Sequence, residues 1–293
     1  MQTNEFGFNF DHSYARLPPA LFEENPYQAL LRRVIEQQAV LIARWMLVGF
    51  VHGVMNTDNM AISGETIDYG PCAFVDTYDP NTVFSSIDYQ GRYAYGRQPA
   101  IALWNLQRFA ETLLPLLDPN QDRAEEMAAV ELARFPELYH KHYLDGMRGK
   151  LGLVDAEPED ESLVRDLLRL MHAYQADFSG TFLDLTYARL EGGELYRSPE
   201  FAQWKTRWQE RLARSPLSRD GVHELMKRSN PAVIPRNHRV EEALRPAVQA
   251  GDYSLVKKLL DVLKDPFAHS AQQHEYAQPP EPSPMPYRTF CGT

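Results

Sequence analysis

The sequence has few cysteines, only Cys72 and Cys291 among 293 residues. This number excludes a disulfide framework and a cysteine-rich zinc site, because both need more thiols. Two reduced thiols and one long-range bridge both stay open. No apolar run approaches the roughly 20 residues that span a bilayer, and the first residues carry neither a signal-peptide nor a transit-peptide pattern. We therefore expect a cytoplasmic protein without a membrane-spanning segment.

Basic residues are also in short supply. The chain has 30 Lys and Arg against 40 Asp and Glu, which gives a formal net charge of −10. A general nucleic-acid binder is excluded, because nothing supplies a basic surface that could follow phosphates. The sequence contains no Gly-x-Gly-x-x-Gly phosphate loop either. With 44% hydrophobic and 24% charged residues, the composition is that of an ordinary globular protein.

Hydrophobic spacing predicts a mainly helical chain. Apolar residues at helical intervals indicate a long helix over 27–46, which ends before Gly49 in the usual position of a C-cap glycine. Two short β-like pieces follow at 50–54 and 60–67, joined by a turn at 63–65. The chain is then irregular to about residue 98, and a loop of that length is usually functional or disordered. Further helices are predicted over 99–117, 121–135, 136–151, 160–175, 177–190, 199–214, 218–228, 239–250 and 253–263.

These elements define the expected fold class and domains. We predict a mainly α protein with a small β-hairpin insert near residues 50–70. Residues 1–26 are expected to form an N-terminal arm, 27–266 a helical domain and 267–293 a proline-rich tail. Trp204 and Trp208 lie four residues apart on one helix face and are expected to pack in the core.

Residues 49–70 carry the chemistry. Asn59 and Asp68 can supply two hard oxygen ligands of the kind that Mg²⁺ prefers beside phosphate oxygens, and the short hairpin between them would bring them together. Chance polar residues in a hairpin are the alternative interpretation. The order His52, then Asn59 seven residues later, then Asp68-Tyr69-Gly70 matches the layout of the protein-kinase catalytic core.

One position departs from the kinase pattern. Val54 stands where a kinase has its catalytic Asp, and valine cannot accept a proton. Phosphate transfer by an ordinary kinase mechanism is therefore disfavoured. Asp58 is the nearest carboxylate that can act as a base.

A longer match accompanies this loop. His-Gly-Val-Met-Asn-Thr-Asp-Asn-Met at 52–60, followed by Ile-Asp-Tyr-Gly-Pro at 67–71, resembles the signature of the selenoprotein O (YdiU) family. Other matching segments lie at 90–95, 97–99, 102–106, 150–153, 230–231, 236–237 and 251–253, with a Cys near the C-terminus. The resemblance covers about residues 27–293. It implies a protein-kinase-like C-lobe that transfers AMP, rather than phosphate, from ATP to Ser, Thr or Tyr hydroxyls of proteins.

The resemblance also implies roles for single residues. Asp58 would be the catalytic proton acceptor, and Asn59 and Asp68 would bind Mg²⁺, or Mn²⁺ in its place. Asp68 would also contact the nucleotide through the metal. The family has a Cys or selenocysteine near its C-terminus, so a Cys72–Cys291 bridge would tether the tail to the active-site loop.

A second departure concerns the N-lobe. Residues 9–18 resemble the start of family members, yet by residue 27 the sequence is already on the helix that leads to the catalytic loop. The family places between these points a lobe with the glycine-rich loop, its lysine and the arginines that grip the nucleotide. We expect most of that lobe to be absent. Apolar surface near Phe50, Val51 and Met60 would then be exposed unless residues 1–26 or a partner chain covered it.

Two functions therefore stay open. The first is a protein adenylyltransferase with ATP and Mg²⁺ as cofactors and protein hydroxyls as acceptors. The second is a catalytically silent pseudokinase fragment that serves as a helical binding module. Asp58, Asn59 and Asp68 favour the first, whereas the missing glycine-rich loop and lysine favour the second.

Overall fold

The computed structural model describes residues 25–281 and 287–290. They belong to two compact units, and the chain passes from one unit to the other five times, twice within a long helix. The first unit contains residues up to Ala43, Val54–Tyr69 and Gln98–His142. The second contains Arg44–Gly53, Gly70–Arg97 and the residues from Tyr143 onward. Most of the arm expected at 1–26 and the whole of Cys291 lie outside the described residues.

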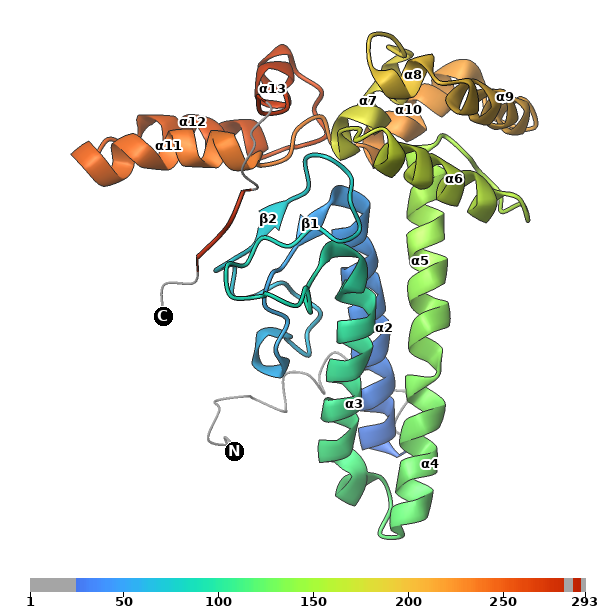
Figure 1. Cartoon of the computed structure of the whole chain (residues 1–293). Coiled ribbons are helices and arrows are strands. Elements are labelled where there is room, and N and C mark those ends of the chain that lie inside the picture. The colour runs from blue at the N-terminus through green and yellow to red at the C-terminus, as the bar shows by residue number, and fades with distance from the viewer. Residues whose placement is uncertain (1–24, 282–286, 291–293) are drawn as a thin grey trace. The chain divides into compact units, whose positions relative to one another are not determined.

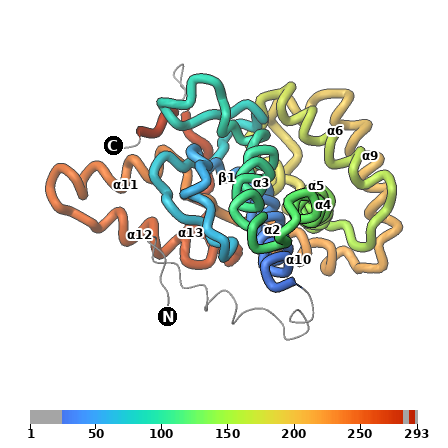
Figure 2. Tube along the Cα trace, turned by 90° about the horizontal axis from the view of Figure 1, so that it is seen from below, coloured from blue at the N-terminus to red at the C-terminus, as the bar shows by residue number. Residues whose placement is uncertain are grey.

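The first unit is built on three helices, α2 (Pro26–Val48), α3 (Gln98–Leu117) and α4 (Gln121–Leu132), which lie side by side in Figures 1 and 2. The side chain of Asn25 accepts hydrogen bonds from the first backbone N–H groups of α2. It also donates to the Leu117 carbonyl at 2.7 Å, which ties the start of α2 to the end of α3. Between α2 and α4, Arg32 pairs with the buried Glu131 at 2.7 Å.

The second unit contains the remaining helices. These are the end of α5 (Arg134–Lys150), α6 (Asp160–Ala173), α7 (Phe178–Tyr187), α8 (Glu194–Arg197), α9 (Pro199–Ala213), α10 (Arg219–Ser229), α11 (Asn237–Ala250), α12 (Ser254–Leu263) and α13 (Ala271–Tyr276). Trp204 and Trp208 are buried in its core, with ring centroids 5.6 Å apart. Their indole N–H groups donate to the Leu163 and Leu151 carbonyls.

Every helix predicted from the sequence is present within a few residues of its expected bounds, so the prediction of a mainly α protein is confirmed. The short helices α8 and α13 were not predicted. Within the described parts of the chain, no helix combines the length and the apolar character needed to cross a membrane.

In the described residues, one pair of strands forms a ladder longer than a single residue pair, and this ladder is short. Gly49, at φ +74°, ends α2 as predicted, and its carbonyl accepts the Val75 N–H at 2.8 Å. Strand β1 (Phe50–Val51) then pairs antiparallel with β2 (Ala73–Phe74). The strand predicted at 50–54 is thus confirmed only in its first two residues, and its partner is β2 rather than the segment at 60–67.

The apolar surface expected around this strand is not exposed. Phe50 and Val51 are 5% and 0% exposed. Aromatic rings from the same unit surround Phe50, with the Trp45 and Phe74 centroids at 5.2 and 5.3 Å. Phe50 and Val51 therefore offer almost no apolar surface for a partner chain to cover, and Met60 is half-buried. The part that residues 1–26 were expected to play in covering them lies mostly outside the described residues.

Candidate functional site

The segment Val54–Tyr69 of the first unit forms a hairpin that is closed by a single antiparallel residue pair, Met60 with Thr66. Its turn contains Gly64, at φ +74°, whose N–H donates to the Ala61 carbonyl at 3.0 Å. A Cβ atom at Gly64 would lie 2.7 Å from the Cβ of Gln37, so glycine lets the turn approach α2 closely. The next residue of α2, Gln38, donates to the Ala61 carbonyl at 2.7 Å.

Helix α3 fixes the other part of the hairpin through Asn105. The side-chain amide nitrogen of this buried residue donates to the Met55 carbonyl at 2.9 Å and lies 2.6 Å from the sulfur of Met60. Backbone groups inside a protein need such partners, because an unpaired one costs free energy. Residue 105 lies in a segment that resembles the family, but the sequence indicated no role for its side chain.

The three predicted site residues lie on the two arms of this hairpin, outside its closing residue pair. Asp58 and Asn59 belong to the short 3₁₀ helix η2 (Thr57–Asn59), immediately before Met60. Counted outward from the Met60–Thr66 pair, Asp58 and Asp68 are each two residues away, on opposite arms. Both carboxylates are exposed, whereas Asn59 is half-buried.

The Asn59 side chain has a defined orientation. Its amide nitrogen donates to the Val54 carbonyl at 3.0 Å. Because the nitrogen is used within the loop, the amide oxygen is the atom left for a ligand. Asn59 is thus arranged to offer an oxygen, which is the atom that a hard divalent cation prefers.

Asp68 has an unusual backbone conformation. Its φ of +52° is in the left-handed region, where Asp and Asn are among the few non-glycine residues found regularly. The strain of such a residue often accompanies a functional position.

The donor set suits a cation that shares its ligands with phosphate. Across the described ranges, no three or more His, Cys, Asp or Glu side chains are grouped so that they could hold a metal ion. The hairpin offers instead two carboxylates and one amide oxygen. Mg²⁺ commonly takes one or two such ligands from protein and the others from water and substrate phosphates, so these residues fit it.

His52 of the sequence motif and Cys72, the residue that follows the motif, lie in the second unit. His52 is completely buried, with its ring 5.4 Å from Trp45 and 6.3 Å from Phe50, which is the environment of a packing residue. Cys72 is half-buried, and burial raises the pKa of its thiol. Because Cys291 is outside the described residues, the bridge between the two cysteines stays a prediction.

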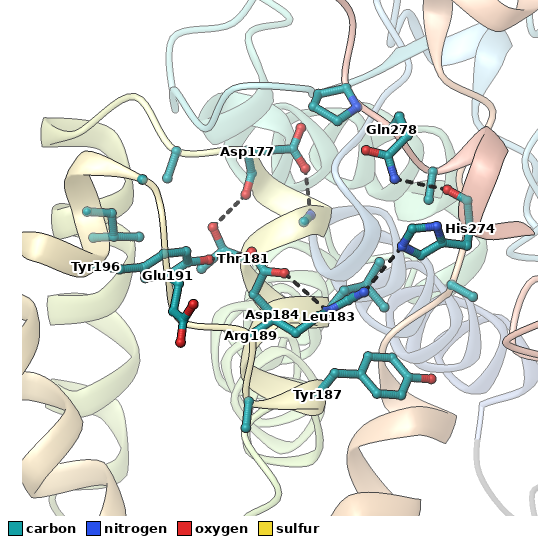
Figure 3. A pocket seen from close by; sticks show the side chains of 18 of the residues that line it. Asp177, Thr181, Leu183, Asp184, Tyr187, Arg189, Glu191, Tyr196, His274 and Gln278 are labelled. Atoms are coloured by element: carbon teal, nitrogen blue, oxygen red, sulfur yellow. Dashed lines mark hydrogen bonds and ion pairs between the residues drawn. The ribbon is translucent and has the colours of Figure 1, made fainter.

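The second unit also contains a pocket of about 1170 Å³, which the sequence did not indicate (Figure 3). Residues of α7, α8 and α13 line it, and none of Asp58, Asn59 and Asp68 does. Asp184 accepts a hydrogen bond from Tyr196 at 2.8 Å, and burial raises the pKa of this carboxyl. Arg189 lies 3.3 Å from His274. Two ion pairs lie in the lining of this pocket, Arg189 with Asp184 at 3.7 Å and Arg236 with Asp177 at 2.6 Å.

Comparison with known proteins identifies the chain. The hairpin carries two exposed carboxylates and a side-chain amide oxygen, which is the kind of donor set that metal-dependent transferases use around nucleotide phosphates. The sequence pattern of the family described as "Protein adenylyltransferase SelO" matches residues 9–264, and the chain belongs to this family.

Several relatives carry the name "Protein nucleotidyltransferase YdiU". The one from Alkaliphilus metalliredigens is 61% identical over 270 residues, covering 92% of this chain and 55% of its own length. Those from Halalkalibacterium halodurans and Geobacillus kaustophilus are 58% and 60% identical, covering 97% and 92% of this chain and 58% and 56% of their own lengths. The chain thus spans a little over half the length of these curated relatives.

Proposed function

We propose that this chain carries the catalytic hairpin of a protein adenylyltransferase, which transfers AMP from ATP to Ser, Thr or Tyr hydroxyls of other proteins. Membership of the SelO family supports this function. The observation that carries it is the Asn59 side chain, whose nitrogen is bonded to the Val54 carbonyl so that its oxygen remains available at the end of the hairpin where Asp58 and Asp68 lie.

Each residue has a separate role in this proposal. The Asn59 amide oxygen and the Asp68 carboxylate would hold Mg²⁺ or Mn²⁺. When bound, the cation would neutralise negative charge on the ATP phosphates. The side chains of Gln38 and Asn105 hold the hairpin in place through hydrogen bonds to its backbone carbonyls. Nucleotidyl transfer needs such a fixed loop, because it depends mostly on positioning and electrostatic stabilisation.

The exposed Asp58 carboxylate acts as the base. It accepts the proton of the protein hydroxyl as the hydroxyl oxygen forms a bond to the α-phosphorus of ATP. The bond between the α-phosphorus and the β-phosphate bridging oxygen breaks, and pyrophosphate leaves. Val54 stands where a kinase has its catalytic Asp and cannot accept this proton. Asp58, four residues further along the chain, takes that role in this proposal. We infer a protein-kinase-like C-lobe that is used for nucleotidyl rather than phosphoryl transfer.

Isotope position distinguishes AMP transfer from phosphate transfer. The purified chain is incubated with cell lysate, Mg²⁺ and ATP labelled on either the α- or the γ-phosphate. We expect protein labelling from the α position alone. Asp58→Ala and Asp68→Ala should abolish labelling, whereas Asp122→Ala, an exposed acid on α4 of the same unit, should leave it unchanged. Labelling from the γ position would contradict the proposal, as would a folded chain that transfers neither label and so acts only as a binding module.

A further inference from the structure

Near the C-terminus, the segment Tyr287–Phe290 lies as an added strand against the loop at 84–86 of the same unit. The Thr289 N–H donates to the Phe84 carbonyl at 2.8 Å, and the Ser86 N–H donates to the Thr289 carbonyl at 2.9 Å. These two bonds make a parallel bridge between Ser85 and Thr289. The edge of this loop thus supplies one main-chain donor and one main-chain acceptor, and Thr289 is bonded to both.

Side chains on one face of the segment make the remaining contacts. The Thr289 hydroxyl donates to the Pro71 carbonyl at 2.7 Å. The Tyr287 ring packs edge-on against Phe84 with centroids 6.1 Å apart, and its hydroxyl donates to Glu241 at 2.9 Å. Tyr287 and Thr289 are half-buried.

The alternate residues face solvent. Arg288 is exposed, and Phe290 is 76% exposed. This alternation is that of a peptide added to a sheet edge, in which main-chain bonds provide affinity and every second side chain provides selectivity. The requirements are thus an extended backbone, a hydroxyl at the Thr289 position and an aromatic ring two residues before it.

We propose that the edge formed by Pro71 and Phe84–Ser86 is a docking site for extended protein segments in which an aromatic residue stands two positions before a Ser or Thr. The chain's own Tyr287–Phe290 occupies this site as an intramolecular competitor. If the function proposed above is correct, the docked segments include acceptors of AMP, and this part of the inference rests on that function. Docking itself requires neither ATP nor transfer of AMP.

A tethered competitor has a measurable consequence. A segment on the same chain acts at an effective concentration in the millimolar range, so a free peptide should bind the intact chain weakly. Thr289→Pro removes both the N–H that bonds Phe84 and the hydroxyl that bonds Pro71. This variant should release the segment and open the edge to a peptide added from outside.

The probe is a fluorescent decapeptide with the sequence of residues 281–290, and its anisotropy is measured without ATP. We expect Thr289→Pro to bind it at least about tenfold more tightly than the unaltered chain. Arg288→Ala, which changes an exposed side chain of the same segment, should bind as weakly as the unaltered chain. Peptides with Pro in place of the Thr, or Ala in place of the Tyr, should bind Thr289→Pro at least about tenfold less tightly than the probe.

Hydrogen exchange locates the binding. The Ser86 N–H should be protected in the unaltered chain, exchange faster in Thr289→Pro, and regain protection when the probe peptide is added. Thermal unfolding of each variant checks that it is folded, and Tyr287→Ala offers a second way to loosen the segment. A folded variant that binds no peptide at millimolar concentration, or that binds the control peptides equally well, would overturn the proposal. Because AMP transfer is not measured, either outcome leaves the proposed function to its own test.

Discussion

The side-chain amide of Asn105, in α3, donates to the backbone carbonyl of Met55 at 2.9 Å. These residues are 50 positions apart, and the bond fixes the start of the hairpin that carries Asp58 and Asn59. Asn105 is 5% exposed, so no water can easily replace it. We regard it as a positioning residue, which acts on the site through the loop.

Asn105→Leu should weaken both folding and transfer. Leucine has a similar volume but leaves the Met55 carbonyl buried without this donor, which typically costs about 1–3 kcal/mol. Urea unfolding measures the loss. Thr112→Ala, on the exposed face of the same helix, should change the free energy of unfolding by less than about 0.5 kcal/mol. Transfer by Asn105→Leu that equals that of the unaltered chain would show that Asn105 does not position the site.

Asp68→Asn separates the charge of this residue from its backbone conformation. Asn tolerates a φ of +52° as readily as Asp does, so the free energy of unfolding should stay within about 0.5 kcal/mol of the original value. The loss of the carboxylate should nevertheless abolish labelling from the α position of ATP and weaken Mn²⁺ binding. If Asn at this position supported full transfer, the role of Asp68 as a metal ligand would be wrong.

The helices were predictable because their signal is local. Apolar residues recur at helical spacing along each long helix, and Gly49 marks the end of α2 with the positive φ that glycine allows. Helices α8 and α13 have four and six residues, too few to show a period. Strands β1 and β2 have two residues each, so no alternation exists that could reveal their pairing.

The candidate site was predictable only where its sequence signal is local. Asp58, Asn59 and Asp68 lie within eleven consecutive residues, and the motif shows them directly. Gln38 and Asn105 hold that hairpin from two helices that are distant in sequence. A polar residue on a helix gives no indication of which carbonyl it will meet, because that depends on how the helices pack.

Arg236 joins three segments of the second unit. This residue is 1% exposed and pairs with Asp76 and Asp177, each at 2.6 Å, and it also donates to the Ala277 carbonyl. Arg236→Met should lower the free energy of unfolding by about 3–5 kcal/mol, because it leaves two carboxylates without their shared partner. Urea unfolding of the variant gives this value.

A matched control for this change is Arg207→Met. Arg207 pairs with Asp166 at 2.6 Å, but its side chain is 49% exposed. Water can replace an exposed partner, so the loss should be below about 1 kcal/mol. Equal losses for the two variants would mean that Arg236 contributes no more than an ordinary surface ion pair.

Lys150 is a buried cation with aromatic neighbours. It is 2% exposed, and its ammonium lies 4.2 Å from the centroid of the Phe182 ring and 5.7 Å from that of Phe178. Burial lowers its pKa from 10.5 to about 7. Between these two pKa values, the unfolded chain holds a proton on Lys150 that the folded chain has released. The contribution of Lys150 to the free energy of unfolding therefore increases as the pH rises from about 7 toward 10.5. Below pH 7 both states are protonated, and the full penalty of the buried charge remains.

Lys150→Met should therefore stabilise the chain at pH 7, and its advantage should shrink at higher pH. Methionine keeps the unbranched shape and carries no charge. The difference in unfolding free energy between this variant and the unaltered chain should fall by up to about 1.4 kcal/mol for each pH unit between 7 and 10. Urea unfolding at pH 7, 8 and 9 measures it, and other titrating groups cancel in the difference. A difference that stays flat with pH would mean that Lys150 keeps its proton in the folded chain throughout this range.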